Sequence, residues 1–287
     1  MADSPPDPLV TIQWLAERLE APDIRAIDAT WFMPSDPRNA RALYEERRIP
    51  GAVFFDIDDI ADKDTDLPHM LPSPEKFASR MRKLGVGDGA RIVIYDGQGI
   101  FSAARVWWTL RVMGHEDVSV LDGGFPAWEK AGYPIDTGPA LTPSERHFTA
   151  RYRADLVRDL KDMRWAVETG RQLILDARPR PRFEGAAPEP RAGLRSGHMP
   201  GAHSMPTSEL IADGFMKSRD DLQKVFAEQG VVGRSPVVCT CGSGVTAAVI
   251  ALALARIGRW DAPVYDGAWA EWGAQDDTPV ATGAGGA

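Results

Sequence analysis

An internal repeat constrains the fold of this chain more than any other feature of its sequence. The stretch from Val237 to Ala248 contains an apolar run, a glycine-rich turn and a pair of alanines, and the stretch from Val93 to Ala104 has the same pattern. Further pairs occur in the same order: Asp28-Ala29 with Asp176-Ala177, Ile49 to Ala52 with Met199 to Ala202, Gly114 with Gly258, and Val120 to Trp128 with Val264 to Trp272. So many matches in one order are hard to obtain by chance, so we predict two copies of one folding unit.

Each copy contains short apolar segments that predict strands, separated by segments of helical character. They are Ile24–Ile27, Ile92–Tyr95 and Ser119–Leu121 in the first copy, and Leu173–Leu175, Val237–Cys239 and Val264–Tyr265 in the second. Such alternation is typical of an α/β fold, with mostly parallel sheets flanked by helices. We expect one domain at residues 1–137, a linker with proline turn signals at residues 138–155, and a second domain at residues 156–287.

Composition narrows the classes of function. Of the 287 residues, 44% are hydrophobic, which is enough for buried cores, and the formal net charge of −8 disfavours a nucleic-acid partner. The two cysteines, Cys239 and Cys241, are too few for a disulfide-stapled secreted protein and have no close His or Cys with which to hold a metal. Neither a signal peptide nor an apolar run of membrane-spanning length is apparent. We therefore expect a cytoplasmic protein without a metal or a membrane partner.

Cys241 is the candidate nucleophile. It stands where a strand gives way to a glycine-rich loop and then to a helix, so loop N–H groups and the helix dipole favour an anionic sulfur. Gly242 and Gly244 let the backbone curl so that these N–H groups point inward. The matching residue of the first copy is Gly97, and a reactive site lost from one copy explains this asymmetry. The alternative is a buried, inert cysteine.

Three segments together resemble the rhodanese family: Gly197 to Ala202, Cys241 to Ala247, and Tyr265 to Trp272. The resemblance covers nearly the whole chain and implies two tandem rhodanese-like domains, the first non-catalytic and the second catalytic. Within the family, the Gly-Ser-Gly after the cysteine is similar to the 3-mercaptopyruvate sulfurtransferase branch. Thiosulfate sulfurtransferases tend to have basic residues at that place.

The resemblance implies a reaction and a substrate site. The Cys241 thiolate would take sulfur from 3-mercaptopyruvate as a persulfide, release pyruvate, and pass the sulfur to a thiol, such as that of a small redox protein, or to cyanide. No cofactor is implied. Arg182 and Arg191 match positions that bind the substrate carboxylate, a group that suits a guanidinium. The loop residues expected to bind substrate with them are Gly242, Gly244, Val245 and Thr246.

A proton relay is also implied by the resemblance. Asp58 and His69 of the first domain would join Ser243 of the loop, because the thiol of mercaptopyruvate, or the enolate left after sulfur transfer, needs a proton handled. The alternative role for His69 is an interdomain hydrogen bond.

Other functions remain open. A phosphatase would need an arginine at the far end of the cysteine loop, and Thr246, Ala247 and Ala248 stand there instead, which disfavours phosphoryl chemistry. Thiosulfate:cyanide sulfur transfer is the nearest alternative reaction. A non-catalytic module that binds partners or carries a persulfide is an alternative of another class. Cys239 is interpreted as a strand residue rather than as a resolving thiol.

Overall fold

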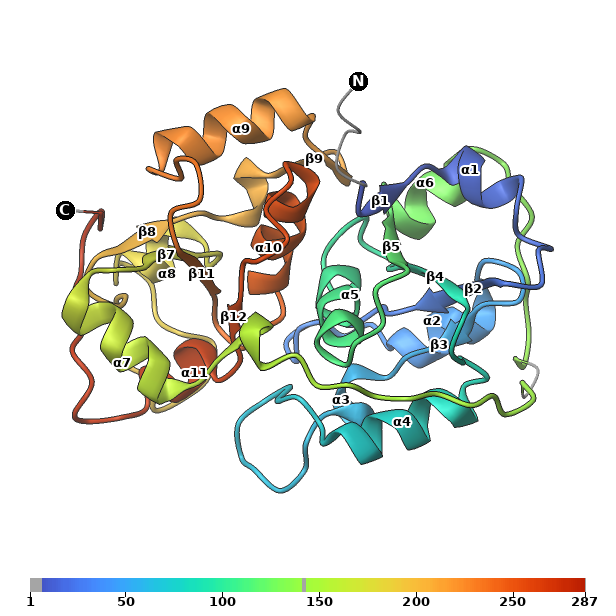
Figure 1. Ribbon diagram of the computed structural model, residues 1–287, viewed down its shortest axis with the longest axis horizontal. Helices are drawn as coiled ribbons and strands as arrows, with labels where there is room; N and C mark the ends of the chain where they lie inside the picture. Colours follow the sequence, from blue (N-terminus) through green and yellow to red (C-terminus); the bar gives the residue numbers. More distant parts are fainter. Residues whose placement is uncertain (1–6, 141–142, 287) are drawn as a thin grey trace.

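Two five-stranded parallel sheets form the centres of two domains (Figure 1). The computed structural model describes residues 7–140 and 143–286. The strands of the first sheet are β1 (Leu9–Val10), β2 (Ile24–Asp28), β3 (Val53–Phe54), β4 (Arg91–Tyr95) and β5 (Val118–Leu121), and those of the second are β6 (Val157–Arg158), β7 (Leu173–Asp176), β8 (Ala202–Ser204), β11 (Val237–Thr240) and β12 (Val264–Tyr265). Their orders, β1-β5-β4-β2-β3 and β6-β12-β11-β7-β8, are the same when the strands are paired in sequence. This identity confirms the predicted repeat and the α/β fold.

All six strands expected from the apolar pattern are present, with ends that agree to within one residue. The pattern missed the short edge strands β1, β3, β6 and β8, because two or three residues carry no periodicity. It also missed an antiparallel hairpin formed by β9 (Ile211–Ala212) and β10 (Phe215–Met216), which stands apart from both sheets.

Helices cover the sheets on both faces, as expected for parallel strands. In the first domain they are α1 (Ile12–Ala16), α2 (Ala40–Glu46), α3 (Ile57–Ile60), α4 (Pro74–Lys83), α5 (Ala103–Val112) and α6 (Gly124–Lys130); in the second they are α7 (Leu160–Thr169), α8 (Arg180–Phe183), α9 (Arg219–Glu228), α10 (Ala247–Arg256) and α11 (Ala268–Trp272). Equivalent helices begin in equivalent ways, since Ser73 caps α4 and Ser218 caps α9 through their side-chain oxygens. No helix of the described residues is long and apolar enough to span a membrane.

The equivalent helices α5 and α10 meet at the centre of the molecule (Figure 1). Every residue of α5 is buried, and so is nearly every residue of α10. A helix that is buried on all sides needs neighbours all round, and here each helix has its own sheet on one side and its counterpart on the other. One hydrophobic core therefore continues from the first domain into the second.

The two domains also exchange backbone contacts symmetrically. Asp122 after β5 accepts a hydrogen bond from the N–H of Met216, and Asp266 after β12 accepts one from the N–H of Leu71, at 2.9 Å and 2.8 Å. Leu71 and Met216 precede the equivalent helices α4 and α9, so the same segment of each domain contacts the other domain. We call residues 69–71 the crossing segment of the first domain. It reaches the carboxyl end of β12, next to the loop that carries Cys241.

The paired tryptophans of the repeat have the same role in each domain. Trp128 and Trp272 are fully buried, and their indole N–H groups donate to the carbonyls of Pro134 and Pro279 at 2.8 Å and 2.9 Å. A buried indole needs an acceptor for its N–H, and both copies supply it from the proline-containing turn that follows.

Candidate active site

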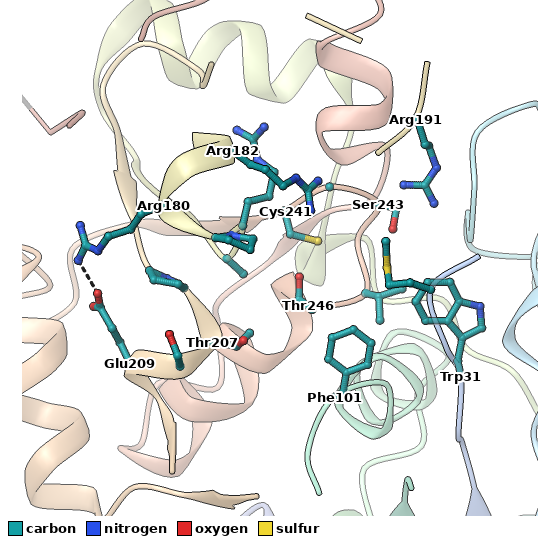
Figure 2. A pocket seen from close by; sticks show the side chains of 18 residues that line it. Trp31, Phe101, Arg180, Arg182, Arg191, Thr207, Glu209, Cys241, Ser243 and Thr246 are labelled. Carbon is teal, nitrogen blue, oxygen red and sulfur yellow. Dashed lines mark hydrogen bonds and ion pairs between the residues drawn. The ribbon is translucent and has the colours of Figure 1, made fainter. Parts of the chain in front are cut away.

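Cys241 lies on the floor of a cleft of about 580 Å³ at the carboxyl end of the second sheet. It follows β11 directly and is only 2% exposed. The carboxyl ends of parallel strands are where α/β proteins bind ligands. Figure 2 shows the Cys241 sulfur pointing into this cleft, with Arg182 and Arg191 above it in this view and Phe101 and Trp31 below it. The cleft is lined by Trp31, Met33 and Phe101 of the first domain, and in the second domain mainly by residues 177–182, Arg191, residues 206–209 and the loop residues Gly242, Ser243, Val245 and Thr246.

Helix α11 fixes the first two peptides of the loop. The N–H groups of Trp269 and Ala270 donate to the carbonyls of Cys241 and Gly242 at 2.9 Å and 3.0 Å. Because the C=O and N–H of a trans peptide point in opposite directions, these bonds turn the N–H groups of Gly242 and Ser243 away from α11. Among the described residues, neither N–H group has an acceptor within the protein. Converging free N–H groups of this kind form a site for an anion.

Gly244 contacts the nucleophile through its backbone. Its conformation is left-handed, with φ of 80°, and its N–H donates to Cys241 Sγ at 3.2 Å. Its carbonyl accepts a hydrogen bond from Arg105 at 3.3 Å, and a Cβ at this position would lie 2.8 Å from the Arg105 guanidinium, so only glycine fits there. Gly244 is not among the residues that line the cleft, and its part in substrate binding stays a prediction.

The two expected arginines both reach the cleft, but they differ in their partners. Arg182 on α8 lies against the loop, since a Cβ on Gly242 would be 2.9 Å from its Nη2. Its guanidinium donates to Glu189 Oε2 at 2.5 Å. Arg191 has no ion pair or hydrogen bond among the described residues, and burial, together with the charge of Arg182, lowers the pKa of Arg191. An anion bound here would stabilise the charged form of the Arg191 guanidinium and so offset the lowering of its pKa.

Glu189 belongs to a buried frame that sequence reasoning missed. Arg178 holds Asp176 through two guanidinium nitrogens, at 3.0 Å and 2.7 Å, and donates to Glu189 at 2.8 Å. The guanidinium of Arg178 also stacks over Trp269 of α11 at 4.2 Å. The frame connects the end of β7, the arginine-bearing segment and the helix that holds the cysteine loop.

Asp58 and His69 are brought together by the crossing segment of the first domain. His69 Nδ1 lies 2.9 Å from Asp58 Oδ1, an ion-pair distance, and Trp31 donates its indole N–H to Asp58 Oδ2 at 2.9 Å. Contact with the His69 ring lowers the pKa of the Asp58 carboxyl. His69 also adopts a left-handed backbone, with φ of 61°, which is strained for a residue other than glycine.

Ser243 is not hydrogen-bonded to this pair. His69 Nε2 is buried without a partner among the described residues, and Ser243 lines the cleft. The two are nevertheless close in the fold, because Arg105 donates one guanidinium nitrogen to the carbonyl of His69 and another to that of Gly244. The structure thus contains an Asp58–His69 pair near the loop, and the relay through Ser243 stays a prediction.

Cys239 is part of the sheet. It is fully buried in β11, beside Leu175 of β7 and Val264 of β12, and burial raises its pKa. A neutral thiol enclosed by apolar side chains is unreactive.

Comparisons with known proteins agree with this geometry. A family model described as "Rhodanese-like domain" matches residues 11–131 and 157–275. The chain is 44% identical to an Escherichia coli protein named 3-mercaptopyruvate sulfurtransferase, covering 94% of this chain and 96% of that protein. It is 41% identical to the human protein of that name, covering 92% and 91%. The crystal structure of an Escherichia coli 3-mercaptopyruvate sulfotransferase, described as having the rhodanese fold, matches with a TM-score of 0.85 at 41% identity, over 92% of this chain and 99% of that one.

Proposed function

This chain belongs to the rhodanese family as a tandem of two rhodanese-like domains, and from that membership we propose that it transfers sulfur from 3-mercaptopyruvate to a thiol acceptor. The observation that carries the proposal is the setting of Cys241. It is a thiol on the floor of a cleft, next in the loop to the free N–H groups of Gly242 and Ser243, and Arg191, which has no hydrogen bond or ion pair among the described residues, lines the same cleft. The relatives named for this activity match over more than nine tenths of the chain, which supports the same assignment.

The first half-reaction forms a persulfide on Cys241. The thiolate attacks the sulfur of 3-mercaptopyruvate, so an S–S bond forms and the C–S bond breaks. The electron pair of that C–S bond stays on the carbon, as the enolate of pyruvate. The proton of the substrate thiol ends on that carbon, so pyruvate leaves and the outer sulfur of Cys241 keeps a negative charge. The step needs neither an oxidant nor a further proton.

The protein contributes charge at two places in this step. Arg191 holds the substrate carboxylate, and Arg182 adds a second positive charge that Glu189 partly neutralises. The free N–H groups of Gly242 and Ser243 hold the sulfur that becomes anionic. The arginine charges near the substrate carboxylate and the loop N–H dipoles near the sulfur together orient the substrate in the cleft.

The Asp58–His69 pair moves the proton. The His69 ring takes up the proton of the substrate thiol and returns it to the enolate carbon, while the carboxylate of Asp58 stabilises the charged ring. Ser243, which lines the cleft, passes the proton between the ring and the substrate, because its hydroxyl can both accept and donate a proton.

The second half-reaction returns the enzyme to its starting state. An acceptor thiolate attacks the outer sulfur of the persulfide, the S–S bond breaks, and Cys241 leaves as a thiolate. The products are the acceptor persulfide and the free enzyme. Kinetics of the ping-pong type follow, because pyruvate leaves before the acceptor reacts.

A comparison of two substrates tests the proposal. Pyruvate release from 3-mercaptopyruvate, with a small thiol as acceptor, is measured beside thiocyanate release from thiosulfate and cyanide. We expect the first reaction to have the larger kcat/KM and Cys241→Ser to abolish it, while Cys239→Ser keeps it. Undiminished pyruvate release by Cys241→Ser would reject the assignment.

Thiosulfate transfer is the second candidate function. Two Arabidopsis thaliana relatives, 40% and 38% identical, are named thiosulfate/3-mercaptopyruvate sulfurtransferases, which favours it as a side activity. Thiosulfate is a dianion without a carboxylate, and Arg191 with Arg182 supplies the positive charge that it would need.

A further inference from the structure

Arg105 of α5 connects three segments at the interface between the domains. It is 2% exposed, and its guanidinium stacks on Trp108 of the same helix at 4.5 Å. Its Nη2 donates to the carboxylate of Asp266 at 2.6 Å and to the carbonyl of His69, and its Nη1 donates to the carbonyl of Gly244 at 3.3 Å. One side chain of the first domain therefore contacts the predicted proton carrier and the loop that holds the nucleophile.

The bond to Gly244 controls the direction of the next N–H group. The carbonyl of Gly244 and the N–H of Val245 belong to one planar trans peptide and point in opposite directions. With the carbonyl drawn toward Arg105, the N–H of Val245 turns away from it, and Val245 lines the cleft. The carbonyls of Cys241 and Gly242 are held by α11 of the second domain. Among the described residues, Gly244 is thus the loop position whose carbonyl is held from the first domain.

In residues 7–140 and 143–286, the inactive copy of the loop has no such guanidinium contact from the other domain. The repeat equivalent of Arg105 is Val249, which has no charge. Asp122, the equivalent of Asp266, has Arg256 at 3.9 Å, but that guanidinium donates to two carbonyls of the segment before α9. The domain that keeps the cysteine is therefore also the one whose loop is held by a guanidinium from the other domain.

We propose that Arg105 is a positioning residue for sulfur transfer. It aims the N–H of Val245 at the anionic sulfur and holds His69 at a fixed distance from the loop, so that the first domain takes part in the reaction of the second. This inference rests on the proposed function for its kinetic consequences, and on the three contacts of the guanidinium for its structural ones.

Two substitutions and a matched control test this role. Arg105→Met removes the guanidinium, and Arg105→Lys keeps the charge but has its donors on one nitrogen, where Arg105 uses both Nη1 and Nη2. Arg111→Met is the control, because Arg111 also lies on α5, is 9% exposed, stacks on two tryptophans and donates across the interface to the carbonyl of Trp260. Within the described residues, no hydrogen bond, ion pair or ring contact joins Arg111 to the loop or to His69.

The kinetic readout is the division of the effect between kcat and KM. Removal of one preorganised donor to a developing anion lowers kcat by about a hundredfold or more, so we expect this loss in Arg105→Met, with a KM change below about threefold. Arg105→Lys should lose at least about tenfold in kcat, and Arg111→Met should stay within about twofold of the unsubstituted protein. A kcat in Arg105→Met or Arg105→Lys equal to that of Arg111→Met would overturn the proposal, and Arg105→Lys decides alone if Arg105→Met does not fold.

Amide hydrogen exchange supplies a readout that needs no substrate. In Arg105→Lys, exchange in the peptide that spans residues 241–247 should become at least about fivefold faster, while Arg111→Met leaves it unchanged. Equal exchange in the two variants contradicts the positioning role. If the unsubstituted protein releases no pyruvate, the proposed function fails, and the exchange measurement still decides the role of Arg105.

Discussion

Glu189 accepts a 2.5 Å hydrogen bond from Arg182, so a buried carboxylate already neutralises one of the two arginines predicted to bind the substrate. Arg191, its neighbour in the cleft, has no hydrogen bond or ion pair within the part of the chain that the structure describes. The two arginines therefore differ in function: Arg191 offers its full charge to a ligand, and Arg182 joins the ligand site to the buried frame of Arg178 and Asp176.

Arg191→Ala should weaken substrate binding more than Arg182→Ala. Loss of the unpaired guanidinium removes a charge-assisted contact to the carboxylate, and we expect KM for 3-mercaptopyruvate to rise by about tenfold or more. Arg182→Ala should raise KM less and should also lower the melting temperature, because Glu189 loses one of its two cations. Steady-state rates of pyruvate release and thermal unfolding of both variants provide the measurements. Equal KM values in the two variants would refute the difference in charge.

Cys241 should be alkylated and Cys239 should not. The Cys241 sulfur faces the cleft, whereas Cys239 is fully buried and burial raises its pKa. After treatment of the native protein with iodoacetamide, fragment-ion mass spectrometry should place the added group on Cys241. Substantial modification of Cys239 in the folded protein would show that the β11 core opens, contrary to its packing.

Replacement of Asp58 or His69 should lower kcat without a comparable change in KM. General acid–base groups contribute about a hundredfold or more, so Asp58→Asn and His69→Asn should each lose activity of that order. The folded pKa of Asp58 lies below its usual value, so its charge, and with it the pairing to His69, is lost only as the pH falls through that lowered value. The Asp58 carboxyl should therefore stay ionised between about pH 5 and pH 8, which the carboxyl-carbon NMR signal of labelled Asp58, assigned by its loss in Asp58→Asn, would measure. An Asp58 signal that titrates within this range would contradict the lowered pKa.

Replacement of Asp28 and of its repeat equivalent Asp176 by asparagine should have opposite effects on the free energy of unfolding at neutral pH. Burial raises the pKa of Asp28 from 3.8 to about 6, so its contribution to stability is full below pH 3.8 and is lost as the pH rises through about 6. The free energy of unfolding of the unsubstituted protein should therefore fall by as much as about 3 kcal/mol between pH 3.8 and about pH 6. Asp28→Asn should remove this fall. Asp176→Asn should cost about 3–5 kcal/mol at neutral pH, because Arg178 loses a buried partner.

Denaturant unfolding at several pH values measures both effects. A curve for Asp28→Asn that runs parallel to that of the unsubstituted protein would contradict the raised pKa. A neutral effect of Asp176→Asn would mean that Arg178 does not depend on that carboxylate.

The sequence predicted the architecture because each half repeats one pattern of apolar segments, and local patterns determine strands and their order along the chain. Cys241 could be located for the same reason, since strand, glycine loop and helix are consecutive. Arg105 could not be found in this way: its contacts with Gly244 and Asp266 join residues more than a hundred positions apart, and within α5 it reads as one residue of a buried helix. Glu189 was missed because a single acidic residue in a loop gives no sign of the two arginines that enclose it.

Two expectations about the site stay predictions that the structure makes more specific. Gly244, expected among the substrate-binding residues, contacts the Cys241 sulfur through its N–H. Ser243 and His69, expected in one relay, lie in the same region, and among the described residues no hydrogen bond joins them. Residue type predicts neither the orientation of a peptide plane nor whether two neighbouring polar side chains are hydrogen-bonded.

Mass spectrometry of the intact protein after one exposure to 3-mercaptopyruvate, without an acceptor, tests the central claim most directly. We predict a gain of one sulfur atom, localised to Cys241 by fragmentation and removed by a subsequent thiol, with one pyruvate released for each sulfur gained. Release of pyruvate without sulfur on Cys241, or sulfur located on Cys239, would contradict the account.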